Sequence, residues 1–277
     1  AAGVHRMAEK GWGCLKSTAV GCGGLIVLAV AIPLILAVMM VAPFQRAVEN
    51  RTVLEERYGN QEAYVPPASG VPAPDRIEAF LSVRRDLTAI CVDLEDAEDQ
   101  VEKLESFDQQ EDVSATQAVK QALSTSRSMM GIGPVMGRLY EVRNASLVRI
   151  EMGLGEFTYL FATAYHRQLL EPPRETQLFG PGPVNSRVRT ALRSMLENQL
   201  EKLSAEGGDP AEIGALEVEI EAMRADSSRL PWQDGLPRSI VEAYGPYRDQ
   251  LDALYFPAAA PLELMINEKR GLAIEGN

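Results

Sequence analysis

Apolar residues follow two patterns along the chain, an uninterrupted run near its beginning and several helical repeats after it. The run extends from Val20 to Phe44, and no charged residue occurs between Lys16 and Arg46. A helix of this length rises about 37 Å, enough to cross a hydrocarbon core of about 30 Å with some tilt. The run therefore predicts one transmembrane helix over 20–44.

A cleavable signal peptide is the alternative interpretation of this run. Its apolar region is usually shorter and ends at a cleavage site of the small-x-small type. Here the run ends in Met-Met-Val-Ala-Pro over 39–43, which places a poor residue three positions before any cut. A retained signal anchor fits this ending better, with a short N-terminal tail over 1–19.

The direction of the predicted span follows weakly from charge, because three basic residues on one side are matched by three on the other. The short tail and the large domain after the span favour a cytoplasmic N-terminus and a body on the extracytoplasmic side. We therefore expect a single-pass membrane protein of this orientation.

Four residues near the start of the run are candidates for contacts in or at the bilayer. Gly21, Gly23 and Gly24 would let another helix approach closely, although membrane helices are commonly rich in glycine. Trp12 would anchor one membrane interface. The expected partners are other subunits of a membrane complex and the lipid bilayer itself.

Two segments are expected between the span and the body. Residues 45–59 contain good helix formers and stop at Gly59, so they predict a juxtamembrane helix that continues into water. Residues 60–74 are rich in proline and predict an extended, fairly stiff linker that separates the anchor from the body.

Beyond the linker the apolar positions adopt helical spacing. Pro74, followed by Asp75 and by Glu78, has the pattern of a helix start. After it, apolar residues alternate at intervals of three and four, which strands cannot produce and which predicts a heptad seam nearly four repeats long. The seam consists of Phe80, Val83, Leu87, Ile90, Leu94, Ala97, Val101 and Leu104.

The remaining helices divide the body into two halves at a turn-rich connection, 178–186. The first half, 75–175, contains the seam helix and two more helices over about 115–130 and 134–170. The second half, 176–277, contains a hairpin of two helices, a last helix broken near Gly245, and a tail. The prediction is an all-α fold, in which one N-terminal transmembrane helix precedes a soluble helical-hairpin body with heptad-patterned helices.

Charge excludes some partners for this body. From Gln45 onward, 24 lysines and arginines face 38 aspartates and glutamates, a net charge of −14. Such a field repels nucleic acid and anionic lipid head groups. It suits a basic protein partner or simply solubility.

The residue types of common catalytic and cofactor sites are scarce. The chain has two histidines and three cysteines, without a CxxC pair, HExxH or GxSxG, and its glycine-rich segment 131–137 lacks the GK[ST] of a phosphate loop. Cys91 is expected to be a buried, inert thiol, and His166 a surface or helix-end residue. We expect no enzyme, no cofactor, no metal site and no small-molecule substrate.

Aromatic residues concentrate in the segment 157–165. Phe157, Phe161 and Tyr165 could line a ligand pocket or form a partner interface. The alternative interpretation, which we favour, is that this segment is the central core helix of the body.

These features together predict a non-catalytic structural or assembly subunit. Its membrane anchor would hold a helical body that docks on a larger membrane complex, possible examples being photosynthetic, respiratory and transport complexes. The alternative hypothesis is a membrane-anchored envelope domain that binds a ligand or senses a signal through the segment 157–165.

Overall fold

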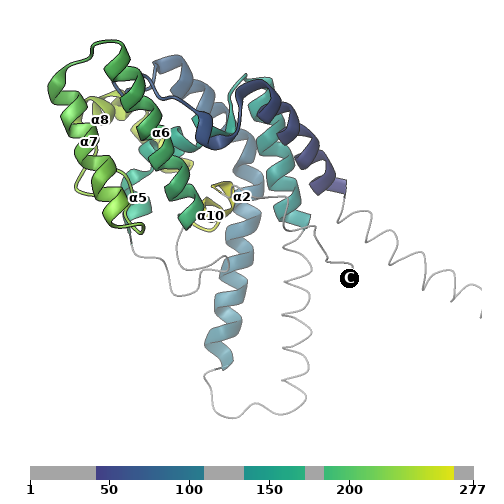
Figure 1. Cartoon of the computed structure of the whole chain (residues 1–277). Helices are drawn as coiled ribbons and strands as arrows, with labels where there is room; N and C mark the ends of the chain where they lie inside the picture. Colours follow the sequence, from purple (N-terminus) through teal and green to yellow (C-terminus); the bar gives the residue numbers. More distant parts are fainter. Residues whose placement is uncertain (1–41, 109–133, 172–183, 265–277) are drawn as a thin grey trace, which may run out of the picture. The chain divides into compact units, whose positions relative to one another are not determined.

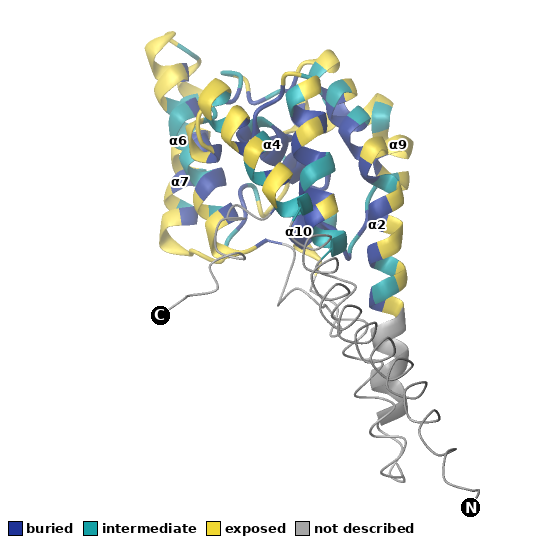
Figure 2. Cartoon of the chain, turned by 90° about the vertical axis from the view of Figure 1, so that its right-hand side faces the viewer, coloured by how far each residue is buried: buried dark blue, intermediate teal, exposed yellow. Residues whose placement is uncertain are grey.

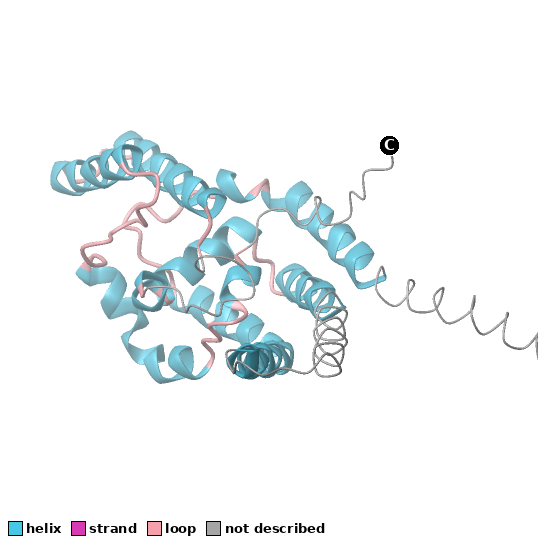
Figure 3. Cartoon of the chain, turned by 90° about the horizontal axis from the view of Figure 1, so that it is seen from below, coloured by secondary structure: helices cyan, strands magenta, loops and turns pink. Residues whose placement is uncertain are grey.

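The computed structural model describes residues 42–108, 134–171 and 184–264. Every regular element in these ranges is an α-helix or a short 3-10 helix (Figure 3). All described residues from Pro43 onward belong to one compact unit. The all-α prediction is confirmed for this part of the chain.

The predicted membrane span lies almost entirely outside the described residues, which begin at 42. The tail with Trp12, the three glycines at 21, 23 and 24, and the helix predicted over 115–130 also lie outside them. Within the described ranges, no helix combines the length and the apolar composition that crossing a bilayer requires. The transmembrane helix therefore stays a prediction.

The predicted juxtamembrane helix is present over residues 42–58. Its end is capped by Gly59, which adopts a φ of +78° and donates its N–H to the Glu55 oxygen at 3.0 Å. The helix packs on the body, because Ala47 is 0% exposed and the Asn144 amide donates to its main-chain oxygen at 2.9 Å.

Helix α2 (Pro74–Asp108) carries the predicted seam and begins at the predicted proline (Figure 1). The five seam residues from Phe80 to Leu94 are at most 3% exposed, and Ala97 is partly exposed. Intervals of three and four place these side chains on one face, which is the face that packs. The seam is therefore confirmed as far as Leu94.

The long helix predicted over 134–170 is instead three helices, which corrects that prediction. They span 134–149, α4 (Leu154–Ala164) and α5 (His166–Leu170). The first ends in a Schellman turn, in which Met152 N–H bonds the Leu147 oxygen at 3.0 Å and Glu151 adopts a φ of +55°. A glutamate in this left-handed position gives no sequence signal, because glycine usually occupies it.

The predicted hairpin is confirmed as α6 (Ser186–Ala205) and α7 (Pro210–Ala225). The Asn185 side chain caps α6 by accepting from the N–H groups of the first turn. Asp209 caps α7 by accepting from Ala211 N–H at 2.9 Å. The two helices pack through a small apolar cluster made by Leu196, Leu216, Ile220 and Met223.

The last predicted helix is broken at Gly245, as expected. The described elements are α8 (Arg238–Tyr244), the 3-10 helix η2 (Gly245–Tyr247), α9 (Arg248–Ala253) and the short α10 (Ala260–Glu263). The apolar segment at α10 docks on this chain itself, since the residues from Ala258 to Leu264 are buried.

The two halves expected on either side of residue 176 share one core. A single cluster of buried side chains includes Phe80 of α2, Phe157 of α4, Leu192 of α6 and Leu262 of α10. Figure 2 shows buried residues on α2, α4 and α6, which come from both halves. The connection near residue 176 therefore does not separate two domains.

The segment 60–73, which we call the strap, does not hold the body at a distance as a linker would. It contains η1 (Gln61–Ala63), and several of its main-chain oxygens accept side-chain hydrogen bonds from α4 and α6. The donors are Asn198 Nδ2 to Glu62 at 2.9 Å, Gln199 Nε2 to Ala68 at 3.1 Å and Tyr159 OH to Gly70 at 2.6 Å.

Close approach of the strap to α4 depends on Gly155. A β-carbon at this residue would lie 2.5 Å from the Gln61 oxygen and 2.5 Å from the Tyr64 Cβ. Proline favours the extended backbone that the sequence predicted, but bonding to the body fixes where that backbone lies. The prediction of a separating linker is corrected accordingly.

Replacing Leu94 by aspartate tests the seam. Leu94 is 1% exposed, so the carboxylate would be buried without a partner, and we expect a loss of at least about 3 kcal/mol in the free energy of unfolding. Thermal melting followed by circular dichroism measures it. Val92→Asp is the matched control, because Val92 is 43% exposed on the same helix. Unchanged melting of Leu94→Asp would contradict the placement.

Candidate functional site

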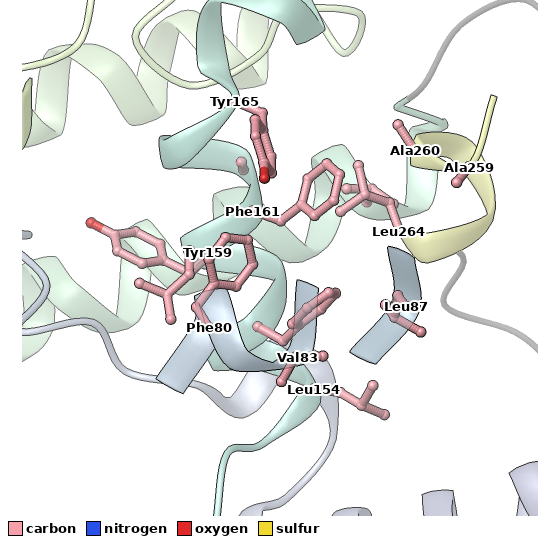
Figure 4. Close-up of a cluster of buried hydrophobic side chains, with 14 of the residues drawn as sticks. Phe80, Val83, Leu87, Leu154, Tyr159, Phe161, Tyr165, Ala259, Ala260 and Leu264 are labelled. Atoms are coloured by element: carbon pink, nitrogen blue, oxygen red, sulfur yellow. The ribbon is translucent and has the colours of Figure 1, made fainter. Parts of the chain in front are cut away.

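Three aromatic residues singled out in the sequence lie together in the core. Phe157, Phe161 and Tyr165 are each 0% exposed. The ring centres of Phe157 and Phe161 are 6.0 Å apart, and those of Phe161 and Tyr165 are 4.9 Å apart. Phe80 of α2 joins them, with its ring centre 5.5 to 6.3 Å from the other three (Figure 4). These separations are typical of favourable aromatic pairs.

Their burial agrees with the core-helix interpretation of the segment 157–165. Phe80 and Phe161 pack edge to face, at an interplanar angle of 87°, as parts of a filled interior. A ligand or a partner would reach Phe157, Phe161 and Tyr165 only if α4 separated from α2. Their role in an interaction therefore stays a prediction, and the buried rings themselves give it no support.

A buried carboxylate and two buried guanidinium groups lie beside the aromatic cluster. Glu263 is 1% exposed, Arg84 is 0% and Arg143 is 1%. Arg84 Nη1 donates to Glu263 Oε2, and Arg143 Nη1 donates to the main-chain oxygen of Glu263 at 2.7 Å. These contacts tie α10 to α2 and to the helix over 134–149. Breaking them would be costly, because a buried charge would lose its partner.

The Arg84 guanidinium is held on several sides. Its Nη2 donates to the main-chain oxygen of Leu254, and its Nε donates to the Tyr165 hydroxyl at 3.3 Å. Its central carbon lies 5.1 Å from the ring centre of Phe161. Stacking on rings together with bonding along the edge suits a guanidinium that has a structural role. Since Arg84 is closed to solvent, it offers nothing to a substrate.

Cys91 is the buried, inert thiol that the sequence predicted. It is 0% exposed, and its sulfur lies 3.8 Å from Glu263 Oε1. Burial raises the pKa of the Cys91 thiol to about 11, although the Arg84 charge acts in the opposite direction. A thiol that stays protonated at neutral pH is a poor nucleophile.

His166 begins α5, as a helix-end residue, but it is only 8% exposed and not on the surface. Its Nε2 lies 2.9 Å from the Pro231 oxygen. Burial lowers the pKa of His166, and the bond to Pro231 and the charge of Glu219 partly offset that effect. A cavity of about 10 Å³ beside it, lined also by Trp232, has room for one water molecule at most.

An apolar stripe faces solvent on α7. We call it the α7 outer face, and it follows intervals of four and three along the helix. Val218, at its centre, is 71% exposed. The exposed carboxylates of Glu212, Glu217 and Glu221 flank it. The α7 outer face consists of Ala211, Ala215, Val218, Ala222 and Ala225.

Intervals of three and four are the spacing at which the side chains of one helix pack between those of another helix. Small side chains allow the two helices to approach closely. The opposite side of α7, with Leu216 and Ile220, already packs on α6. The α7 outer face is therefore a second packing face without a described neighbour. It is the candidate site for an interaction.

Other chemistries and relationships give no further direction. Among the described residues, no three histidine, cysteine, aspartate or glutamate side chains are placed to hold a metal ion. No protein family model, no curated protein and no solved structure matches this chain.

Sequence reasoning missed the charge cluster, although the sequence contains a signal for it. Arg84 and Cys91 fall at intervals of seven from Ile77, within the same helical face as the seam. Glu263 is the one charged residue in the apolar run 256–266. A lone charge of each sign on an apolar face indicates a buried pair, but sequence alone does not say which two residues meet.

Removing the Glu263 carboxylate should be more harmful than removing the whole pair. Glu263→Ala leaves Arg84 buried without its partner, which costs ~3–5 kcal/mol of unfolding free energy. The double variant Arg84→Met with Glu263→Leu should lose less than Glu263→Ala alone, because neither charge of the pair remains to be desolvated. Urea denaturation measures both. A double variant less stable than Glu263→Ala would contradict this account.

Burial of His166 predicts a pH dependence. The unfolded chain binds a proton near the ordinary histidine pKa, whereas the folded state resists it because burial lowers the pKa of His166. The free energy of unfolding should therefore keep its full value above about pH 6.5 and decrease as the pH drops below it. Urea denaturation between about pH 7.5 and 5.5 measures this, and His166→Gln should reduce the slope. An equal slope in both proteins would exclude His166 as its source.

Proposed function

We propose that this protein is a non-catalytic accessory subunit, anchored in a membrane, which docks its helical body on a larger membrane complex. The observation that carries the proposal is the α7 outer face. A stripe of small apolar side chains with helical spacing and a 71% exposed valine lets a helix of a partner approach closely.

The charges beside the stripe specify the kind of partner. Glu212 and Glu217 would face the flanks of a helix docked on the stripe, whereas Glu221 is already paired with Arg224. Opposite charges on those flanks steer association and fix register. We therefore infer that the partner presents an apolar helix with basic residues on both sides, in keeping with the net charge of −12 on this chain.

The start of the body supports a location at the membrane surface. Ala47 is fully buried, and it lies three residues after the predicted end of the span at Phe44. The helix over 42–58 packs on the core through Ala47, so little free chain remains between the predicted anchor and the core. The partner would thus be met close to the bilayer, on the extracytoplasmic side if the N-terminus is cytoplasmic.

The alternative, a ligand-binding or sensory domain that uses the segment 157–165, has less support. It needs a pocket at Phe157, Phe161 and Tyr165, and these rings pack on Phe80 in the core. An accessory role needs no such pocket. It needs an outward face that a partner can reach, and the α7 outer face supports it.

Copurification from native membranes tests the proposal. The tagged chain, extracted in mild detergent, should retain partner subunits, and Val218→Arg should release them because a charge would enter the apolar contact. Val92→Arg is the matched control, since Val92 is a 43% exposed valine on α2. Recovery of the unmodified chain as a lone monomer would contradict the function. Retention of all partners by Val218→Arg would contradict the use of α7.

A further inference from the structure

A cleft of about 320 Å³ lies on the side of the body where α4 and α5 face α8 and α9. This volume is within the range of small-molecule sites. Both walls of the cleft bend around it. One wall is broken between α4 and α5 at Tyr165, and the other between α8 and α9 at Gly245. Helices α5 and α8 are labelled in Figure 1.

Apolar side chains form a large part of the cleft. Leu236, Val241 and Leu251 line it, and Val241 is 39% exposed. The polar groups at its base are already bonded to each other, since the Tyr244 hydroxyl lies 2.8 Å from Thr163 Oγ1. An apolar group of a ligand would therefore cover apolar surface without breaking hydrogen bonds of the protein.

Two guanidinium groups stand at the cleft. Arg167 of α5 and Arg248 of α9 both line it and are both exposed. In the described part of the chain neither makes an ion pair or a side-chain hydrogen bond, in contrast to Arg224 and Arg238, which are each paired with a glutamate. The N–H groups of both guanidinium groups are therefore available to bond a ligand.

The other titratable groups of the lining fix the charge of a suitable ligand. Asp252 carries the one carboxylate among the lining residues and accepts from Gln168 Nε2 at 3.3 Å. His166 is buried, and its ring is bonded to Pro231. Two positive groups against one negative group leave one net positive charge in the lining, which favours a ligand with a single negative charge. The net charge of −12 on the protein disfavours ligands with more negative charge.

We propose that this cleft binds a small monocarboxylate with an apolar body. Its carboxylate would accept hydrogen bonds from Arg167 and Arg248, and its apolar part would lie on Leu236, Val241 and Leu251. Arginine suits this role because its planar fork matches a carboxylate. Asp252 disfavours a doubly charged anion such as phosphate. This inference is independent of the α7 outer face, which belongs to another part of the surface.

Fluorine NMR with 4-(trifluoromethyl)benzoate tests the inference on the full chain in zwitterionic detergent. We expect binding with a Kd of about 1 mM or tighter. Arg167→Gln with Arg248→Gln should weaken it at least about tenfold, because two charge-assisted hydrogen bonds are lost. Arg224→Gln with Arg238→Gln is the control, since it removes the same charge from arginines outside the cleft and should leave the Kd unchanged.

Three outcomes would overturn the inference. They are absence of binding to the unmodified chain, equal weakening by both double variants, and displacement of the probe by inorganic phosphate at equal concentration. Circular dichroism of each variant establishes that it is folded. Val241→Glu gives a second route, because a carboxylate on the apolar wall should repel the probe while both arginines remain.

Discussion

The buried ion pair between Arg84 and Glu263 is the contact on which the architecture depends. It joins the first long helix to the last described one, across a separation of 179 residues. Desolvation of both charges offsets much of the attraction, so we infer that the pair acts more on specificity than on net stability. Apolar side chains would tolerate several registers of α10 on α2. A carboxylate that must meet one particular guanidinium tolerates only one register.

The aromatic cluster and the strap are arranged around the same centre. Arg84 stacks on Phe161 and bonds Tyr165, so the charge cluster and the ring cluster are continuous. The other side of α4 holds the strap through Tyr159, and Gly155 gives the strap room. Helix α4 is consequently buried along most of its length, and Thr163 and Ala164 at its end line the cleft. The outward faces, on α7 and at the cleft beside α5, belong to the periphery of this arrangement.

The helices were predictable because they depend on local patterns, whereas contacts between distant segments were not predictable. The seam from Phe80 to Leu94, the helix start at Pro74 and the stop at Gly59 each depend on a few neighbouring residues, and all three were predicted. The break after residue 149 escaped, because Glu151 occupies a left-handed position that glycine usually marks. The strap escaped because its path is set by Asn198, Gln199 and Tyr159, more than 80 residues away. The α7 outer face escaped as well, because only the packing of Leu216 and Ile220 on α6 shows which side of α7 stays exposed.

The distance in sequence between Arg84 and Glu263 also has a consequence for biosynthesis. Ribosomes add roughly 5–20 residues per second, so 179 further residues take roughly 10 to 40 s. During that time the seam helix has emerged, but its guanidinium has no carboxylate to meet. A nascent chain in this condition is a natural client for a chaperone or for a translocation channel that shields it. The order of synthesis thus leaves the interior open until its final piece arrives.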